Sequence, residues 1–80
     1  MKYRIIEPEE VRVLKGSVIR ELRIKKGLTQ EELGEAVGMT QSQISLIEKH
    51  GTDRISIVKV FGEVFGLSVV EMLRLAEGKH

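Results

Sequence analysis

The side chains with the most specific chemistry lie in the stretch QSQISLIEKH, residues 41–50. A helix rotates successive side chains by about 100°, which places Ile44 and Ile47 together on a side that we expect to be buried. The opposite side carries Ser42, Ser45, Leu46 and Lys49, with Gln41 at its edge. We call the four neutral residues of this surface the reading face: Gln41, Ser42, Ser45 and Leu46. Helix faces that only meet solvent usually carry more Lys and Glu. Amides and hydroxyls match the donors and acceptors of base edges, and leucine matches the thymine methyl, so this face is typical of a helix that reads the DNA major groove.

The sequence on either side of this helix predicts how it is positioned. Thr29 is followed three residues later by Glu32, and Thr40 by Gln43. This spacing is that of a reciprocal cap, in which the hydroxyl and the N3 side chain each bond a free backbone amide, and it predicts helices over 30–37 and 41–50. The connection between them is too short for antiparallel packing, so we expect a steep crossing, as in a helix-turn-helix.

Gly34 lies inside the first of these two helices, where glycine costs about 1 kcal/mol relative to alanine. We interpret it as the position of closest approach at the crossing, where a larger side chain would push the helices apart. The sequence therefore predicts that Gly34 is a packing requirement.

The remaining pattern is also helical and predicts a compact all-α bundle of five helices. We expect a first helix from about Glu9 to Lys26, with an interruption near Gly16 as the alternative, after an extended segment at 2–6. The fourth helix is expected over 54–65, with Asp53 or Thr52 as its cap, and the fifth over 69–77 with a cap from Ser68 and Glu71. Five glycines are expected to end helices in the left-handed conformation: Gly16, Gly27, Gly38, Gly51 and Gly66. The domain boundaries that we expect are an arm with the start of the first helix at 1–15, the DNA-binding domain at 16–77 and a tail at 78–80.

Length and composition limit the alternatives. Eighty residues correspond to one domain, and the absence of cysteine excludes disulfides and thiolate metal sites. His50 and His80 have no acidic partner at ligand spacing, so no metal is expected. No nucleophile arrangement, phosphate-binding glycine loop or cofactor motif is present, and we expect neither an enzyme nor a cofactor. With no signal-peptide core or membrane-spanning stretch, a cytoplasmic protein is predicted.

Charge is unevenly distributed along the chain. Residues 1–27 contain eight Lys or Arg and four Glu, although the whole chain has a net charge of only +1. A chain with one basic end and one acidic end can orient itself on a polyanion. The alternative interpretation is that the charged residues simply lie on solvated helix faces.

Residues 16–73 resemble the lambda-repressor-like Xre/Cro family of helix-turn-helix domains. The stretches that carry the resemblance are IRELRIKKGLTQEELGEAVG, MTQSQISLIE and RISIVKVFGEVFGLSVVEML. The resemblance implies a five-helix bundle with 41–50 as recognition helix, which binds a palindromic operator in double-stranded DNA as a homodimer. It also implies a transcription regulator, as a repressor or autoregulator.

Individual roles follow from the same resemblance. The reading face would contact base edges, and Gln30 would contact a phosphate and brace Gln41. The implied phosphate contacts are Gln30, Thr29, Thr40, Gln43, Lys49, His50 and Arg54. Thr29 and Thr40 are better explained as caps, and the structural role is also favoured for Gln43. Arg23 and Glu48 match a family ion pair that clamps the recognition helix against the first helix.

Some features depart from the family pattern or leave alternatives open. The loop KHGTDR has Asp53 where a phosphate would be repelled, and Gly62, Phe61 and Phe65 differ in size from the usual residues. For a dimer seam we expect apolar residues of the last helix, with the arm at 3–6 as a further contributor: Val69, Met72 or Leu75. Leu73 is expected in the core. The alternative function is an antitoxin or other protein-interaction module, with a toxin as the possible partner.

Overall fold

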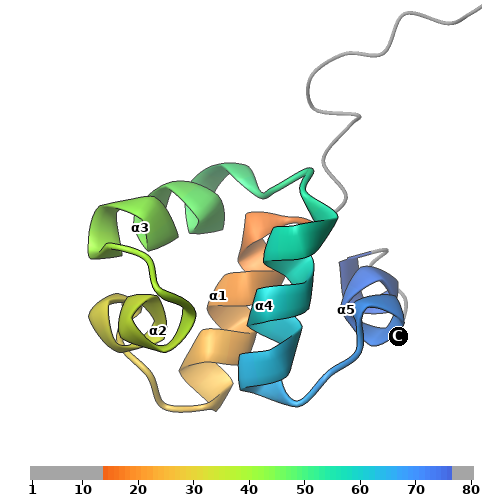
Figure 1. Ribbon diagram of the computed structural model, residues 1–80, viewed down its shortest axis with the longest axis horizontal. Coiled ribbons are helices and arrows are strands. Elements are labelled where there is room, and N and C mark those ends of the chain that lie inside the picture. The colour runs from red at the N-terminus through yellow and green to blue at the C-terminus, as the bar shows by residue number, and fades with distance from the viewer. Residues whose placement is uncertain (1–13, 77–80) are drawn as a thin grey trace, which may run out of the picture.

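The computed structural model describes residues 14–76, and the described part consists of five helices joined by short loops (Figure 1). Their bounds are α1 Gly16–Lys25, α2 Gln30–Val37, α3 Gln41–His50, α4 Ile55–Phe65 and α5 Val69–Ala76. The extended backbone within residues 14–76 is limited to one isolated antiparallel bridge, between Leu14 and Thr52. The predicted all-α bundle of five helices is confirmed.

Each helix contributes to a single core because each has one apolar side. Helices α1 and α4 lie at the centre, with α2 and α3 on one flank and α5 on the other (Figure 1). The rings of Phe61 and Phe65 stack with their centroids 6.4 Å apart. The fully buried hydrophobic residues come from all five helices and the segment before α1: Leu14, Ile19, Leu33, Ile44, Val58, Phe61 and Met72. Burial of this shared core is what fixes α3 on the bundle.

The predicted starts of α2, α3 and α5 are confirmed by their caps. The Thr29 hydroxyl accepts from the Glu32 amide at 3.0 Å, and the Glu32 carboxylate accepts from the Thr29 amide at 2.9 Å. The same reciprocal pair joins Thr40 to Gln43. Ser68 and Glu71 form the third pair, before α5. Each box satisfies two backbone amides that a helix start otherwise leaves unpaired.

The expected continuous first helix from Glu9 is wrong, and the interruption at Gly16 is present. Leu14 and Thr52 exchange two backbone hydrogen bonds, with N···O distances of 3.1 and 3.0 Å, and Lys15 is extended, so α1 begins at Gly16. Gly16 does not end a helix: a Cβ there would overlap the backbone carbonyls of Ile47 and Glu48. The other four glycines of the set have positive φ. Gly38 and Gly66 end their helices in the left-handed conformation, as predicted, whereas Gly51, with ψ −171°, does not. Residues 9–13 and the expected extended segment at 2–6 lie outside the described residues.

The expected cap of α4 is also wrong. Arg54 is the residue before α4, and its side chain makes no capping hydrogen bond. The Thr52 hydroxyl instead accepts from the Arg54 amide at 3.2 Å. Thr52 is only 4% exposed, because its backbone pairs with Leu14. Thr52 lies three residues before Ile55, the first residue of α4, and its hydroxyl closes a turn onto the Arg54 amide.

Candidate nucleic-acid interface

The connection between α2 and α3 depends on two glycines. Gly38 ends α2 in the left-handed conformation at φ 77°, and the Met39 amide donates back to the Gly34 carbonyl at 2.8 Å. This close return brings the Met39 carbonyl so near Gly34 that an added Cβ would overlap it. Gly34 is therefore a packing requirement, as predicted, and the contact that demands it is the backbone of the turn.

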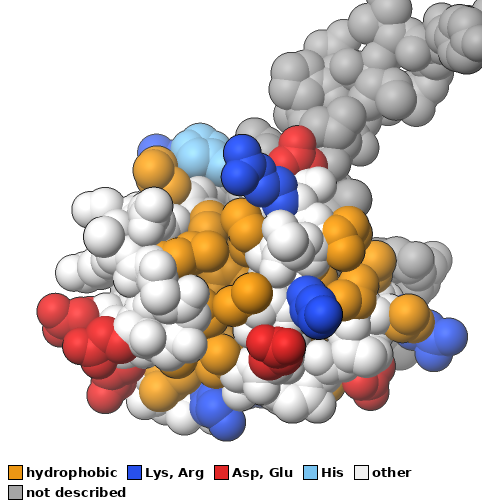
Figure 2. Space-filling model, viewed as in Figure 1, with side chains coloured by type: hydrophobic (Ala, Val, Ile, Leu, Met, Phe, Trp, Pro, Cys, Tyr) orange, Lys and Arg blue, Asp and Glu red, His pale blue; other side chains and the backbone are white. Residues whose placement is uncertain are grey.

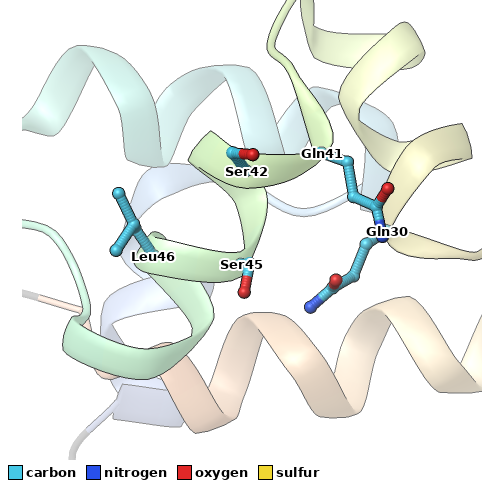
Figure 3. Close-up of a pocket in the computed structure, with 5 residues that line it drawn as sticks. All are labelled: Gln30, Gln41, Ser42, Ser45 and Leu46. Carbon is cyan, nitrogen blue, oxygen red and sulfur yellow. The ribbon is translucent and has the colours of Figure 1, made fainter.

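The turn presents α3 at the surface with the expected orientation. Ile44 is completely buried and Ile47 is half-buried, whereas all four residues of the reading face are exposed. Leu46 retains 58% of its accessible surface. Leu46 projects away from α2, and Gln41 projects toward it (Figure 3). The reading face thus combines one exposed aliphatic group with three neutral polar groups.

Gln30, the first residue of α2, completes an open pocket whose other lining residues are the reading face (Figure 3). The Gln41 side chain extends toward Gln30, whose own side chain runs on past it and ends on the side of Ser45. The Gln30 amide nitrogen donates to the Glu48 carboxylate at 3.1 Å. Gln30 therefore lies beside Gln41, as the resemblance implied, and is hydrogen-bonded to a residue nearer the end of α3.

Glu48 lies on the inner flank of α3 and forms an ion pair with Arg23 of α1. The Arg23 Nε donates to one carboxylate oxygen at 2.6 Å, and Nη2 donates to the other at 3.2 Å. The remaining guanidinium nitrogen donates to the Leu28 carbonyl at 2.8 Å. The two side chains are only 13% and 4% exposed. The pair expected from the resemblance is present, and its bidentate geometry joins α1, α3 and the loop before α2.

The residues expected to contact phosphate fall into two groups. The Thr29 and Thr40 hydroxyls and the Gln43 side chain take part in capping boxes, which agrees with the structural role favoured for them. Lys49, His50 and Arg54 are exposed. Figure 2 shows blue and pale blue side chains over the end of α3 and the following loop. Acidic side chains gather on the far side of α2, which carries Glu31, Glu32 and Glu35. Positive charge therefore lies at one end of the α2–α3 unit and negative charge at the other.

Comparison with known proteins now identifies this arrangement. The model of a family described as helix-turn-helix matches residues 19–71, which is more than half of the chain. The chain belongs to this lambda-repressor-like helix-turn-helix family. A solved structure, that of the clp gene regulator ClgR from C. glutamicum, is similar to the helix-turn-helix domain with a TM-score of 0.72 and 26% sequence identity, covering 96% of each chain. No curated protein matched the sequence.

The residues that α5 exposes differ from those that were expected to form a dimer seam. Met72 is completely buried, so its place in the seam is wrong: it closes the core against α4. Val69 is half-buried and packs on the core, as does Leu73, for which this was predicted. Leu75 remains 43% exposed, and Val70, which the sequence analysis did not select, is 58% exposed. The arm at 3–6 lies outside the described residues.

Two further features of the helix-turn-helix domain concern ions and membranes. Among residues 14–76 no three His, Asp or Glu side chains are grouped closely enough to hold a metal ion. No helix in the same part of the chain has the length and apolarity to span a bilayer.

The hydrogen bond between Gln30 and Glu48 could not be predicted from the sequence, because the two residues are 18 positions apart and share no periodic pattern.

Proposed function

We propose that this chain is a transcription regulator that binds double-stranded DNA sequence-specifically, as a homodimer, by inserting α3 into the major groove. The observation that carries the proposal is the exposed reading face, which is backed by the fully buried Ile44. Family membership supports DNA binding, and the similar solved structure is titled a gene regulator. Repression or autoregulation is the mode of action that we propose.

Base recognition is assigned to the reading face. A glutamine amide presents a donor and an acceptor that bond adenine N6 and N7 together, and serine hydroxyls bond either kind of base edge. Leu46 supplies an apolar surface for a thymine methyl group. Gln41 and Ser42 lie in the first turn of α3, where side chains reach beyond the helix end. Ser45 and Leu46 lie one turn later and would contact the adjacent base pairs.

Backbone anchoring is assigned to the cations at the end of α3 and the start of α4. Lys49, His50 and Arg54 are exposed there, and the capped start of α2 offers backbone amides at the other end. Each neutralised phosphate contributes about 0.9 to the slope of log K against log salt concentration. With so few cations beside the reading face, nonspecific affinity will be low and base contacts will carry a large share of specific binding.

The homodimer is proposed because one helix reads only a few base pairs. Two copies on half-sites about one helical turn apart, roughly 34 Å, would double the contact area. The exposed apolar residues of α5, Val70 and Leu75, are the candidates for contact between the copies.

Selection from a pool of random duplexes tests the proposal, followed by gel shifts with the selected duplex. We expect a palindromic motif. Gln41→Ala and Ser42→Ala should each lose about 1–3 kcal/mol of binding free energy, with relaxed preference at one base pair. Arg20→Ala, an exposed cation on α1 outside the interface, is the matched control and should bind as the unmodified chain does. Failure to select any motif would reject DNA reading and favour the protein-interaction module.

A further inference from the structure

The geometry points to Gln30 as a positioning residue that sets the rotation of α3 about its own axis, and thereby the base preference of the reading face. This inference rests on the proposed function and deepens it. The family resemblance implies a phosphate contact for Gln30 and a brace on Gln41, at the start of α3. In the structure its amide nitrogen is bonded inward, to Glu48, and Gln30 is half-buried.

The chemistry of Glu48 determines which end of the Gln30 amide faces it. An ionised carboxylate only accepts hydrogen bonds, so the NH₂ group of Gln30 must point toward it. The carboxylate is 4% exposed and already accepts two hydrogen bonds from Arg23. The contact from Gln30 is therefore a third hydrogen bond to a buried charge, and such charge-assisted bonds are stronger than neutral ones.

The place of Glu48 on α3 explains why this bond affects base reading. Gln41, Ser45 and Glu48 are spaced i, i+4 and i+7, so they form one stripe along the helix. Arg23 holds the end of this stripe from α1, and Gln30 holds it from the first turn of α2. Two attachments on different helices restrict rotation of α3 where one would leave it less constrained. A small rotation of α3 would move the Gln41 amide and the Ser45 hydroxyl together relative to the base edges.

The Gln30 NH₂ group has two N–H donors, and the bond to Glu48 uses one of them. The phosphate role and the positioning role nevertheless predict different losses. Removal of a phosphate contact made by a neutral side chain weakens binding to all duplexes equally, because phosphate contacts carry no sequence information. Removal of a positioning contact weakens binding only to the duplex that the reading face recognises, and leaves the salt slope unchanged.

Gel shifts of Gln30→Met at several salt concentrations distinguish these roles, with the selected duplex and an unrelated duplex as probes. Methionine has similar length and helix propensity but no donor. We expect affinity for the selected duplex to fall about tenfold, comparable to one lost base contact, while affinity for the unrelated duplex and both salt slopes stay unchanged. Lys49→Ala provides the phosphate pattern for comparison. An equal loss on both duplexes, or no loss on either, would overturn the inference.

A second measurement uses the unmodified protein without DNA. Solution NMR of the free chain should show slower solvent exchange for the side-chain amide protons of Gln30 than for those of Gln43, whose amide oxygen and not its nitrogen makes the capping bond. Equal exchange rates would overturn the inference. This measurement separates the two failures: absence of a selected motif rejects the proposed function, whereas equal exchange rejects the positioning role of Gln30 even when a motif is found.

Discussion

At the scale of single residues, the Glu48 carboxylate organises the interface from inside. It accepts hydrogen bonds from Arg23 and Gln30, and through Arg23 it is linked to the Leu28 carbonyl. Burying a carboxylate is costly unless its lone pairs are satisfied, and here its partners come from two other helices. The same group therefore contributes to stability and to the placement of the recognition helix.

The first prediction is that Glu48→Ala strongly destabilises the fold. The change leaves the Arg23 guanidinium, which is 13% exposed, without its carboxylate partner. Breaking a buried pair in this way costs about 3–5 kcal/mol, and the Leu28 bond that Arg23 keeps places the expected loss near the lower end. Thermal melting followed by circular dichroism measures it. Lys49→Ala, the exposed neighbour on α3, should change stability by no more than about 0.5 kcal/mol. Equal melting temperatures for Glu48→Ala and the unmodified chain would refute the clamp.

The second prediction concerns acid. Hydrogen bonds from the Ser68 backbone and then its side chain, together with the nearby charge of Arg74, hold the pKa of Glu71 below its ordinary value of 4.5. Because the folded-state pKa is lowered, the ionised carboxylate stabilises the fold above pH 4.5, and this contribution disappears as the pH falls through the folded-state pKa. Glu71→Gln keeps the acceptor and cannot ionise. The difference in melting temperature between the two proteins should shrink between about pH 6 and pH 3; a difference independent of pH would contradict this.

At the scale of elements, the α2–turn–α3 unit determines where the reading face lies. Its two helices begin with capping boxes, and its turn returns so closely on α2 that the backbone of Met39 touches Gly34. The caps define where α3 starts, and the turn defines the direction in which it leaves. Both are local, whereas the ion pair of Glu48 fixes the far end of α3 to α1.

The third prediction is that Gly34→Ala destabilises the protein although alanine favours helix formation. The added Cβ would overlap the Met39 carbonyl, which belongs to the backbone and cannot rotate away. Overpacking of this kind costs about 1–3 kcal/mol and outweighs the gain of about 1 kcal/mol in helix propensity. Urea unfolding measures the difference, with Glu35→Ala, the next and exposed position on α2, as control. A higher urea midpoint for Gly34→Ala would show that the turn has room.

At the scale of the whole molecule, charge and exposed apolar surface are separated. Cations lie beside the end of α3, acids lie on α2, and α5 exposes Val70 and Leu75 at the opposite flank of the bundle (Figures 1 and 2). Exposed apolar residues on one helix suit contact with another copy, since each half-site can then be read by its own α3. The small size of the core makes such a contact useful for stability as well.

The fourth prediction follows from this distribution. Leu75→Lys introduces a charge into the proposed contact between copies and should reduce occupancy of the palindromic duplex from two chains to one, because the pair would have to bury that charge. Light scattering of the protein with operator-length DNA measures the ratio. Ile24→Lys is the matched control, since Ile24 is 55% exposed but lies on α1. Two chains bound by Leu75→Lys, or one bound by the unmodified chain, would argue against α5 as the contact.

The sequence by itself determined where α2, α3 and α5 begin and which residues make up the reading face. Capping pairs and left-handed glycines depend on hydrogen bonds that span only three or four residues. The starts of the helices after Thr29, Thr40 and Ser68 can therefore be predicted without the rest of the chain. The rotation of a helix by about 100° per residue likewise separates Ile44 from Ser42 in advance.

Only the tertiary structure decided the features that depend on contacts between distant segments. The sequence suggests that Gly16 ends a helix. In the structure glycine is required there because the backbone at the end of α3 packs against it and leaves no room for a Cβ. Thr52 pairs through its backbone with Leu14 and does not cap α4. Met72 is buried because α5 packs on α4. The bond between Gln30 and Glu48 exists because packing brings the first turn of α2 beside the end of α3. Local hydrogen bonding is encoded within a few residues, whereas proximity across the bundle is created by burial of the shared core.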